Sequence, residues 1–345
     1  MAVRQITLGS TGITTPQNAF GALPIQRADY DTAVKILRKA YEVGGMTFFD
    51  TARAYSNSEE KMGLALSDVR DKIHISTKTM AKTPEELKVH LEMSLANLKT
   101  DYVDILQFHM ADRCFCPGDG TGMYEQMEDF KRQGMIRHIG ITAHKIGVAE
   151  ECAASGLYET LQFPFSYLSG DREAALVQSC KEHNVGFICM KALAGGLITN
   201  SRAAFAFISQ YDNTLPIWGI QRESELDEWI SYMKNPPEMD DELQALINAD
   251  RKELNGEFCR GCGYCMPCPM GIKINNCARM SLMLRRAPSE GWLSETWQEN
   301  MKQIERCIDC RSCASKCPYE LDTPELLRRN YEDYKRVLAG EVRVN

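Results

Sequence analysis

The chain has 345 residues, of which 44% are hydrophobic and 25% are charged, and its formal net charge at pH 7 is −7. This composition is that of an ordinary globular protein and excludes a disordered chain, and the length allows one large domain and a small one. Lys and Arg are scattered, and no apolar run approaches the ~20 residues that span a bilayer. We therefore expect a soluble protein that binds neither nucleic acid nor membrane.

Up to about residue 233, short apolar runs alternate with longer amphipathic stretches, which predicts repeated βα units around a parallel sheet. Helices are expected after the strands, among them Asp29–Val43 and Thr83–Leu98, the latter opening on an N-cap Thr followed by Pro. Eight units favour a closed (β/α)8 TIM barrel, which takes ~250 residues. The predicted strands are Ala19–Ala22, Met46–Asp50, Ile73–Thr77, Val103–His109, Ile136–Thr142, Glu159–Phe163, Val185–Met190 and Thr214–Ile220.

Four ionisable side chains stand at or just after the ends of three successive predicted strands: Asp50, Tyr55, Lys78 and His109. In such a barrel the chemistry lies at the C-terminal ends of the strands, so the four would converge at one mouth. Each alone has an ordinary explanation, as a helix cap, a packed ring, a solvated amine or a buried histidine. Together they suit acid catalysis, because a tyrosine with a pKa near ~10 becomes a better proton donor when a buried ammonium stabilises its anion.

The segments that carry these residues resemble the aldo/keto reductase superfamily, and the resemblance covers essentially the whole barrel. It implies that Tyr55 is the proton donor and that Lys78 and Asp50 tune it. His109 would orient the substrate carbonyl. The similar stretches are ITLGSTGI (Ile6–Ile13), FFDTARAY (Phe48–Tyr55), SNSEEKMG (Ser56–Gly63), STK (Ser76–Lys78), ILQFH (Ile105–His109), GITAH (Gly140–His144), LQFPFS (Leu161–Ser166) and LAGGL (Leu193–Leu197).

The positions that would hold a nicotinamide depart from this family. Relatives use a Ser-Asn-Gln set for the carboxamide and an aromatic ring for stacking, and the corresponding positions here are Thr142, Ala143, Gln162 and Met190. Only part of that nucleotide site is therefore kept.

The stretch after the eighth strand departs as well. In WGIQRESELDEW (Trp218–Trp229), Gly219, Glu225, Glu228 and Trp229 stand where the family usually has a basic residue for the 2′-phosphate of NADP and a Glu…Asn pair for adenine. Arg222 is the only obvious cation left. A carboxylate facing a doubly charged phosphate is unfavourable, so we expect weak NADP(H) binding, and FMN or another flavin is the alternative cofactor.

The loop after His109, residues 111–122, is rich in Gly and carries Cys114 and Cys116. It is interpreted as a substrate-shaping loop with ordinary thiols, and a redox-active or ligating pair is the alternative. Four further cysteines have no partner at a recognisable spacing and are expected to be small buried hydrophobes: Cys152, Cys180, Cys189 and Cys277.

A domain boundary is predicted at Asn235-Pro236-Pro237, which ends the eighth helix. Residues 1–235 would form the barrel, 236–256 a helical linker, 257–322 a small α-helical ferredoxin-like domain, and 323–345 a C-terminal helix and tail. Helices are expected over Asp240–Leu254, Trp292–Ile304 and Thr323–Ala339.

Eight of the fourteen cysteines lie in two short runs, CRGCGYCMPCP from Cys259 and CIDCRSCASKCP from Cys307. The second run has the C-x2-C-x2-C-x3-C-P spacing of bacterial ferredoxins, in which the fourth cysteine ligates the other cluster. This spacing predicts two [4Fe–4S] clusters, although a single cluster or another partition stays open. One cluster would be held by Cys259, Cys262, Cys265 and Cys317, and the other by Cys307, Cys310, Cys313 and Cys268.

Zinc is the rival metal, but zinc sites take two cysteines from each run, whereas each run here has four. A disulfide framework is disfavoured, because no apolar signal-peptide region follows Met1 and so many thiols suit a reducing cytoplasm. The tail also resembles the subgroup of aldo/keto reductases that carries a C-terminal ferredoxin-type domain.

The sequence therefore predicts a cytoplasmic oxidoreductase that acts on a carbonyl or alcohol substrate, with clusters that exchange electrons with a ferredoxin or another carrier. Hydride chemistry on a nicotinamide moves two electrons together and needs no such relay. The clusters are then structural, or the barrel holds a flavin, or the substrate takes electrons singly. The alternative is a redox-responsive binding or regulatory protein whose barrel has lost turnover.

Overall fold

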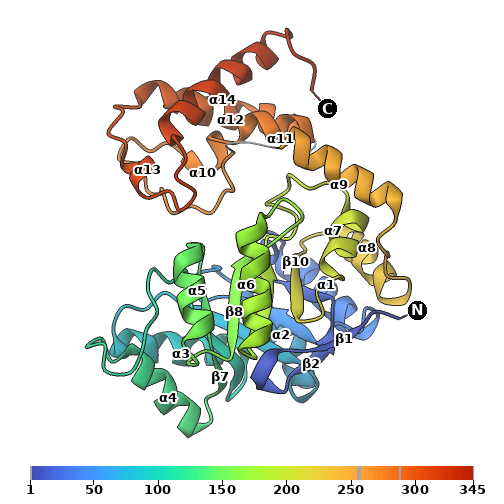
Figure 1. Cartoon of the computed structure of the whole chain (residues 1–345), viewed down its shortest axis with the longest axis vertical. Helices are drawn as coiled ribbons and strands as arrows, with labels where there is room; N and C mark the ends of the chain where they lie inside the picture. Colours follow the sequence, from blue (N-terminus) through green and yellow to red (C-terminus); the bar gives the residue numbers. More distant parts are fainter. Residues whose placement is uncertain (1, 255–257, 287–288, 345) are drawn as a thin grey trace. The chain divides into compact units, whose positions relative to one another are not determined.

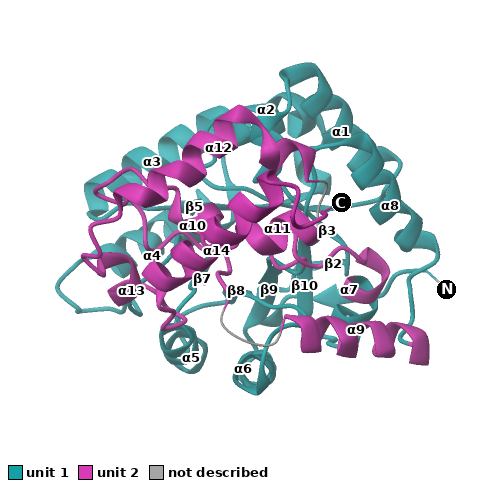
Figure 2. Ribbon diagram, turned by 90° about the horizontal axis from the view of Figure 1, so that it is seen from above, with its two compact units in different colours: residues 1–192, 205–239 teal, residues 193–204, 240–345 magenta. Residues whose placement is uncertain are grey.

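The computed structural model describes residues 2–254, 258–286 and 289–344. The chain forms two compact units, of which unit 1 comprises residues 1–192 and 205–239, and unit 2 residues 193–204 and 240–345 (Figure 2). The boundary predicted at residue 256 lies outside the described residues. The expected linker helix and the C-terminal helix both group with unit 2, as does the segment 193–204 that follows the seventh barrel strand.

Unit 1 is the predicted barrel, and all eight strands are confirmed to within two residues at each end. Its strands are parallel and close in the order β10-β3-β4-β5-β6-β7-β8-β9. Figure 1 labels β7, β8 and β10 of this barrel, and helix α5 (Ile146–Ala154) lies beside β8. Unbroken apolar runs form these strands because both faces of a parallel sheet are buried. The bounds are β3 Ala19–Gly21, β4 Phe48–Asp50, β5 His74–Thr79, β6 Val103–Phe108, β7 Ile136–Thr142, β8 Thr160–Pro164, β9 Gly186–Met190 and β10 Thr214–Gly219.

Helices follow the strands in the sequence and cover the barrel. Asp29 caps the first of them by accepting a hydrogen bond from the Thr32 amide, and this helix buries the apolar positions that its sequence spacing predicts. The bounds are α1 Tyr30–Glu42, α2 Ser58–Leu66, α3 Pro84–Leu98, α4 Met123–Gln133, α5 Ile146–Ala154, α6 Asp171–Glu182, α7 Ser201–Ile208 and α8 Glu223–Lys234.

A short antiparallel hairpin, β1 (Gln5–Thr7) and β2 (Thr14–Pro16), packs on the N-terminal end of the barrel. Its Ile6, Leu8 and Ile13 join one apolar cluster with inward residues of the strands. At Gly9, between β1 and β2, a Cβ atom would lie 2.3 Å from the Gly186 amide nitrogen, so only glycine allows this close approach. The hairpin covers the end opposite to the strand C-termini.

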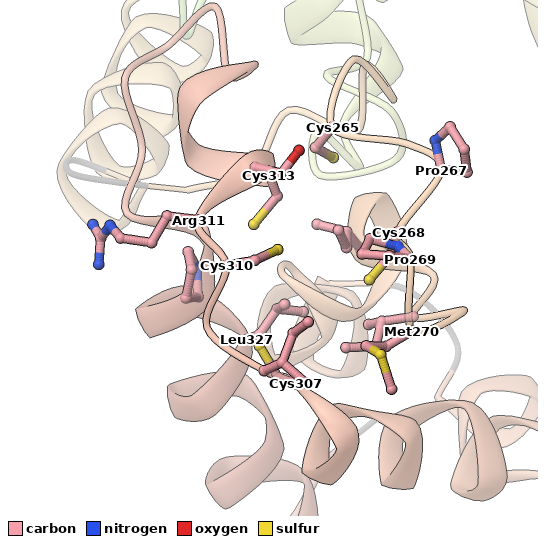
Figure 3. Close-up of a pocket in the computed structure, with 15 residues that line it drawn as sticks. Cys265, Pro267, Cys268, Pro269, Met270, Cys307, Cys310, Arg311, Cys313 and Leu327 are labelled. Atoms are coloured by element: carbon pink, nitrogen blue, oxygen red, sulfur yellow. The ribbon is translucent and has the colours of Figure 1, made fainter.

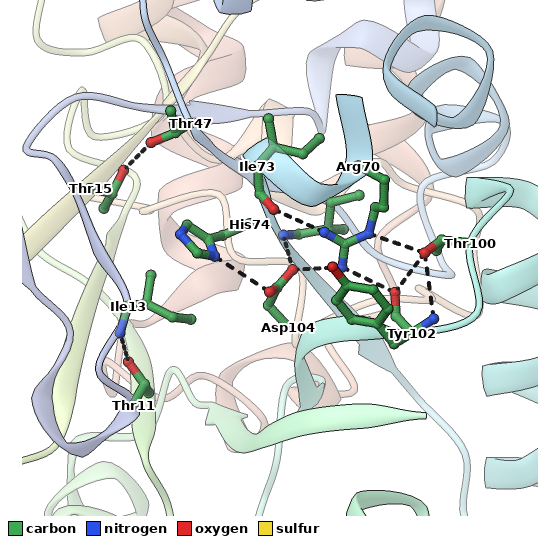
Figure 4. Close-up of polar contacts among 11 residues, drawn as sticks. Thr11, Ile13, Thr15, Thr47, Arg70, Ile73, His74, Thr100, Tyr102 and Asp104 are labelled. Carbon is green, nitrogen blue, oxygen red and sulfur yellow. Dashed lines mark hydrogen bonds and ion pairs between the residues drawn. The ribbon is translucent and has the colours of Figure 1, made fainter. Parts of the chain in front are cut away.

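Buried charges join neighbouring strands at the same N-terminal end (Figure 4). The Arg70 guanidinium donates to Asp104 Oδ2 at 2.6 Å, and the Ile75 amide donates to the same oxygen at 2.8 Å. His74 Nδ1 lies 3.4 Å from Asp104 Oδ1. Polar groups at this end of a (β/α)8 barrel serve stability rather than catalysis.

Unit 2 is helical, with a core built on the apolar face of its last helix, α14 (Thr323–Leu338). Leu327 and Tyr334 of that helix pack with Ile274 and Met301 from the chain between the cysteine runs. The remaining elements are α9 Asp241–Glu253, α10 Ile274–Cys277, α11 Met280–Arg286, η4 Glu290–Leu293, α12 Glu295–Lys302, η5 Gln303–Arg306 and α13 Ser312–Ser315.

The single helix predicted over Trp292–Ile304 is wrong in extent, because the segment is divided among η4, α12 and η5. Ser294, with ψ 155°, is not helical and separates the first two of these elements. In the described part of the chain, no helix is long and apolar enough to cross a membrane.

Candidate active site and cysteine cavities

The C-terminal ends of β4, β5 and β6 bring together the predicted residues Asp50, Lys78 and His109. Asp50 is the last residue of β4, Lys78 is the penultimate residue of β5, and His109 directly follows β6. Lys78 Nζ donates to Asp50 Oδ1 at 2.5 Å and to the Thr51 carbonyl at 2.5 Å. Because both charged side chains are at least 98% buried, the ammonium is held in one position at the floor of the mouth.

Tyr55 lies in the loop after β4 and completes the group. Lys78 Nζ is 5.2 Å from the centroid of the Tyr55 ring. The rings of Tyr55 and His109 meet edge to face, with their centroids 5.7 Å apart. The four side chains predicted to converge are therefore neighbours.

Burial and charge act in opposite directions on these groups. Burial raises the pKa of Tyr55 above its usual value, and the Lys78 ammonium only partly offsets that rise. The net lowering of this pKa that the sequence suggested is therefore not found in the protein alone. Burial likewise raises the pKa of Asp50 against the opposing charge of Lys78.

His109 is neutral at physiological pH, since burial, aided by the Lys78 charge, lowers its pKa to about 3. Its buried Nδ1 atom has no hydrogen-bond partner among the described residues. A neutral imidazole with a free ring nitrogen suits binding of a polar, uncharged substrate atom.

Two further ionisable residues at strand ends were not among the predicted site residues. His144 follows β7 and is buried, and burial lowers its pKa well below the usual value, with added effects from the Lys191 charge and from His109. Lys191 directly follows β9 in a left-handed conformation, with φ 58°. The rule that located Lys78 and His109, proximity to a strand end, would also have found these two.

The residues expected to hold a nicotinamide are engaged within the barrel. Thr142 Oγ1 accepts a hydrogen bond from the Met110 amide at 2.8 Å, and Gln162 Oε1 accepts one from Gln107 Nε2 at 2.8 Å. Met190 is buried at the end of β9. A ligand at this position would therefore compete with contacts that already exist.

The cation expected to face a 2′-phosphate is already paired. Arg222 donates to Glu225 Oε1 through Nε at 2.8 Å, while Glu225 Oε2 accepts from the Arg222 amide at 3.1 Å and caps α8. Trp229 does not stand open for adenine, because it is buried and stacks on Trp218 with the ring centroids 4.0 Å apart. Gly219 ends β10, where a Cβ would lie 3.0 Å from the Pro24 ring.

The cysteine loop after β6 has a partner that its sequence spacing does not indicate. The Cys114 thiol interacts with the Cys152 thiol of α5, and burial raises the pKa of both. Thiols with raised pKa values are weak nucleophiles. Cys152, Cys180, Cys189 and Cys277 are all buried, as the sequence analysis expected.

Within unit 2 the eight cysteines of the two runs surround two cavities. The first cavity is lined by Cys259, Cys262, Cys265 and Cys317. The second cavity is lined by Cys268, Cys307, Cys310 and Cys313, with Cys265 also at its edge (Figure 3). In each cavity, cysteines from both runs therefore face one space, as crossed cluster ligation requires.

The chemistry of the lining suits iron–sulfur clusters. Apolar side chains complete the second cavity, including Ile272, Ile274 and Leu327. Burial raises the pKa of Cys265 to about 12, so this thiol needs a metal to be held as a thiolate. Across the residues that the structure describes, no three His, Cys, Asp or Glu side chains converge on a position for a single metal ion.

Similar proteins agree with this division of the chain. The model of the aldo/keto reductase family matches residues 5–205, and that of a 4Fe–4S dicluster domain matches residues 258–322. The aldo-keto reductase YhdN of Bacillus subtilis is 28% identical over 216 residues, which cover 56% of this chain and 63% of the relative. The D-galacturonate reductase of Fragaria ananassa is 30% identical over 175 residues, covering 43% of this chain and 54% of the relative.

The chain thus spans less than two thirds of the length of these relatives. Among solved structures, the holo form of the aldo-keto reductase AKR11C1 from Bacillus halodurans superposes with a TM-score of 0.63 at 19% identity, covering 72% of this chain and 96% of that one, a likeness of fold. With a barrel of this fold and a family match over residues 5–205, the chain belongs to the aldo/keto reductase family, and its C-terminal part is a 4Fe–4S dicluster domain.

Proposed function

We propose that the protein is an iron–sulfur oxidoreductase that reduces a carbonyl or oxidises an alcohol at the barrel mouth. The observation that carries this proposal is the buried Lys78 ammonium, held by Asp50 next to the Tyr55 ring, with the neutral His109 edge to face with that ring. In this arrangement Tyr55 would donate a proton, and the fixed Lys78 ammonium would stabilise its anion. The names of the relatives, which are reductases, agree with it.

Each residue has one task in the proposed reaction. His109 binds the carbonyl oxygen through its neutral ring and orients it towards Tyr55. Reduction of a carbonyl to an alcohol takes up two electrons and two protons. The Tyr55 hydroxyl donates the proton that goes to oxygen, and the Lys78 ammonium stabilises the phenolate that remains. The two electrons would come from the redox cofactors of the protein and the second proton, which goes to carbon, from water. Asp50 keeps the ammonium in place.

The two cavities of unit 2 are proposed to hold two [4Fe–4S] clusters. Cys259, Cys262, Cys265 and Cys317 would ligate the cluster of the first cavity, and Cys268, Cys307, Cys310 and Cys313 that of the second. Such clusters supply or accept one electron each when bound. A ferredoxin or a similar carrier in the cytoplasm would then be the electron-transfer partner.

Nicotinamide is a doubtful cofactor for this barrel. The Glu225 carboxylate offsets the positive charge of Arg222, which weakens its attraction for a 2′-phosphate. Gln162, expected to bind the carboxamide, is already hydrogen-bonded to Gln107. These two contacts also favour the second candidate function, a redox-responsive binding protein with a largely inactive barrel. A flavin at the mouth remains the alternative cofactor.

Anaerobic reoxidation of the reduced protein tests the proposal. The protein is reduced with a limiting amount of dithionite, a panel of aldehydes and ketones is added, and the visible absorption is followed with time. We expect at least one carbonyl compound to reoxidise the protein. The Tyr55→Phe variant should do so ~10²–10⁴-fold more slowly, because it lacks the general acid.

The Tyr41→Phe variant, altered on the outer helix α1, should react like the unaltered protein. Equal reoxidation rates for the unaltered protein and Tyr55→Phe would contradict the assigned proton donor. A protein that no carbonyl compound reoxidises would favour the binding function.

A further inference from the structure

The Arg279 guanidinium packs closely against two glycines of unit 2. It lies between α10 and α11, and its Nη1 atom donates to the Gly195 carbonyl at 3.1 Å. A Cβ at Gly195 would lie 2.6 Å from that nitrogen, and a Cβ at Gly261 would lie 2.9 Å from the guanidinium carbon. The guanidinium is thus packed between the loop that carries Gly195 and the first cysteine run.

This side chain is not fully hydrogen-bonded. Its Nε atom is buried and has no hydrogen-bond acceptor among the described residues. A buried N–H without an acceptor costs ~1–3 kcal/mol, so such a group calls for an explanation. No carboxylate partner of Arg279 is present in the described part of the chain, and the ionisable group that interacts with its charge is Cys259.

Cys259 is a proposed ligand of the first cavity. Its Sγ atom accepts a hydrogen bond from the Gly261 amide at 3.3 Å, on the same glycine against which Arg279 packs. Arg279 is therefore a half-buried positive charge that packs against Gly261 of the first cysteine run and interacts with the Cys259 sulfur. Arg260, which lines this cavity, stacks on Tyr319 with 4.6 Å between the guanidinium carbon and the ring centroid.

The charge in the described lining of the second cavity is exposed and paired. Arg311 is the only charged residue in its described lining. Its side chain is 56% exposed, and it is paired with Asp322 at 2.9 Å. A paired charge that faces water contributes little to the potential inside a cavity.

From this asymmetry we propose that Arg279 raises the reduction potential of the cluster in the first cavity above that of the cluster in the second. The inference rests on the proposed cluster sites. A reduced cluster carries one more negative charge than an oxidised one, and nearby charge and hydrogen bonds to sulfur set the potential. A guanidinium that interacts with a ligand sulfur stabilises the reduced form, so electrons entering unit 2 collect in the first cavity.

The test is a redox titration of the anaerobically purified full chain, followed by electron paramagnetic resonance, with iron counted in each sample. The unaltered protein should titrate in two steps. Cys317→Ala should remove the step at higher potential, and Cys307→Ala the step at lower potential. Loss of the higher step in Cys307→Ala instead would overturn the inference.

The Arg279→Gln variant should keep its iron while the higher step moves to lower potential and the other stays. We expect the ratio of reduced to oxidised cluster at a given potential to fall about tenfold, which is about 59 mV for a one-electron couple. Arg279→Lys, which keeps the charge, should retain most of the potential. Arg311→Gln is the matched control and should leave both steps unchanged.

Two outcomes would contradict the inference. If Arg279→Gln titrates like the unaltered protein, or shifts no more than Arg311→Gln does, the inference is wrong while the cluster sites stand. If the unaltered protein holds about four iron atoms instead of about eight, the cluster assignment itself fails and the inference fails with it.

Discussion

Lys78 is the residue on which the barrel site depends, because one ammonium acts on three neighbours. It is bound to Asp50 at 2.5 Å, it lowers the pKa of Tyr55 against the effect of burial, and it disfavours the charged form of His109. Removing this charge should therefore change the pH dependence of the reaction and not only its rate.

We expect Lys78→Met to lower activity at neutral pH and to move the alkaline limb of the pH–rate profile to higher pH. Without the ammonium the phenolate of Tyr55 loses its stabilising charge, so its pKa rises further. Rates measured across the pH range on the substrate found by reoxidation would check this. Lys88→Met, on the exposed side of α3, is the control, and an unshifted alkaline limb in Lys78→Met would contradict the role of Lys78.

The buried carboxylate of Asp104, at the N-terminal end of the barrel, leads to a prediction about the free energy of unfolding. Burial alone would raise its pKa, but hydrogen bonds and charge from His74, Arg70 and the Ile75 amide lower it below the usual value. A carboxyl with a depressed folded pKa stabilises the fold above its unfolded pKa of ~3.9, and that contribution is lost as the pH falls towards the folded value.

Asp104→Asn should therefore destabilise unit 1 by ~3–5 kcal/mol at neutral pH, because Arg70 is left as an unpaired buried charge. The deficit should shrink as the pH falls below about 4, where the carboxyl of the unfolded chain takes up a proton while the native carboxyl is still charged. Thermal unfolding followed by circular dichroism at several pH values measures it. Asp68→Asn, which removes an exposed partner of Arg38, should have little effect, and an equal loss in both variants would refute this reading.

At the scale of elements, the start of α8 bears on the NADP(H) binding that we propose to be weak. Glu225 both caps this helix and neutralises Arg222, so one side chain serves the helix at the expense of an anion site. The contact that stabilises the start of this helix would therefore weaken the binding of a 2′-phosphate.

Glu225→Gln should raise the affinity for NADPH about tenfold, or ~1.4 kcal/mol, with a smaller gain for NADH. The amide keeps a capping oxygen and releases the Arg222 charge. Anaerobic calorimetry with both nucleotides measures the difference, and Asp227→Asn on the same helix, which removes a partner of Lys39, is the control. If NADPH and NADH gain equally, Arg222 does not face the 2′-phosphate.

Within the whole molecule, unit 2 has a small core that includes two of the proposed cluster ligands. Cys259 and Cys313 are buried in the same apolar cluster as Leu327 and Tyr334 of α14. Metal binding and folding are coupled where a core is this dependent on its ligands.

We expect about eight iron and eight sulfide per chain, and Cys313→Ala should lose about half of each and destabilise unit 2. Unit 1 should keep its own unfolding transition, since it has a separate core. Metal and sulfide analysis with calorimetry would check this, and Cys180→Ala on α6 is the control. Zinc without sulfide would refute the cluster sites.

The sequence alone was enough to predict the barrel strands and the group of ionisable side chains at their C-terminal ends. Unbroken apolar runs of strand length predict buried parallel strands, and closure of eight such strands brings Asp50, Lys78 and His109 to one end. These conclusions need only local periodicity and one topological rule, so they could be reached without coordinates. Cysteine spacing, likewise local, was enough to predict the iron–sulfur domain.

Only the tertiary structure decided which distant groups meet and how far burial shifts them. Arg279 reaches Gly195 across 84 positions of the chain, and Cys114 meets Cys152 of another element. No periodicity encodes such contacts, because they arise from packing between segments. The pKa of Tyr55 also depends on how much water the fold removes from its hydroxyl. Here burial raises this pKa by more than the Lys78 ammonium lowers it.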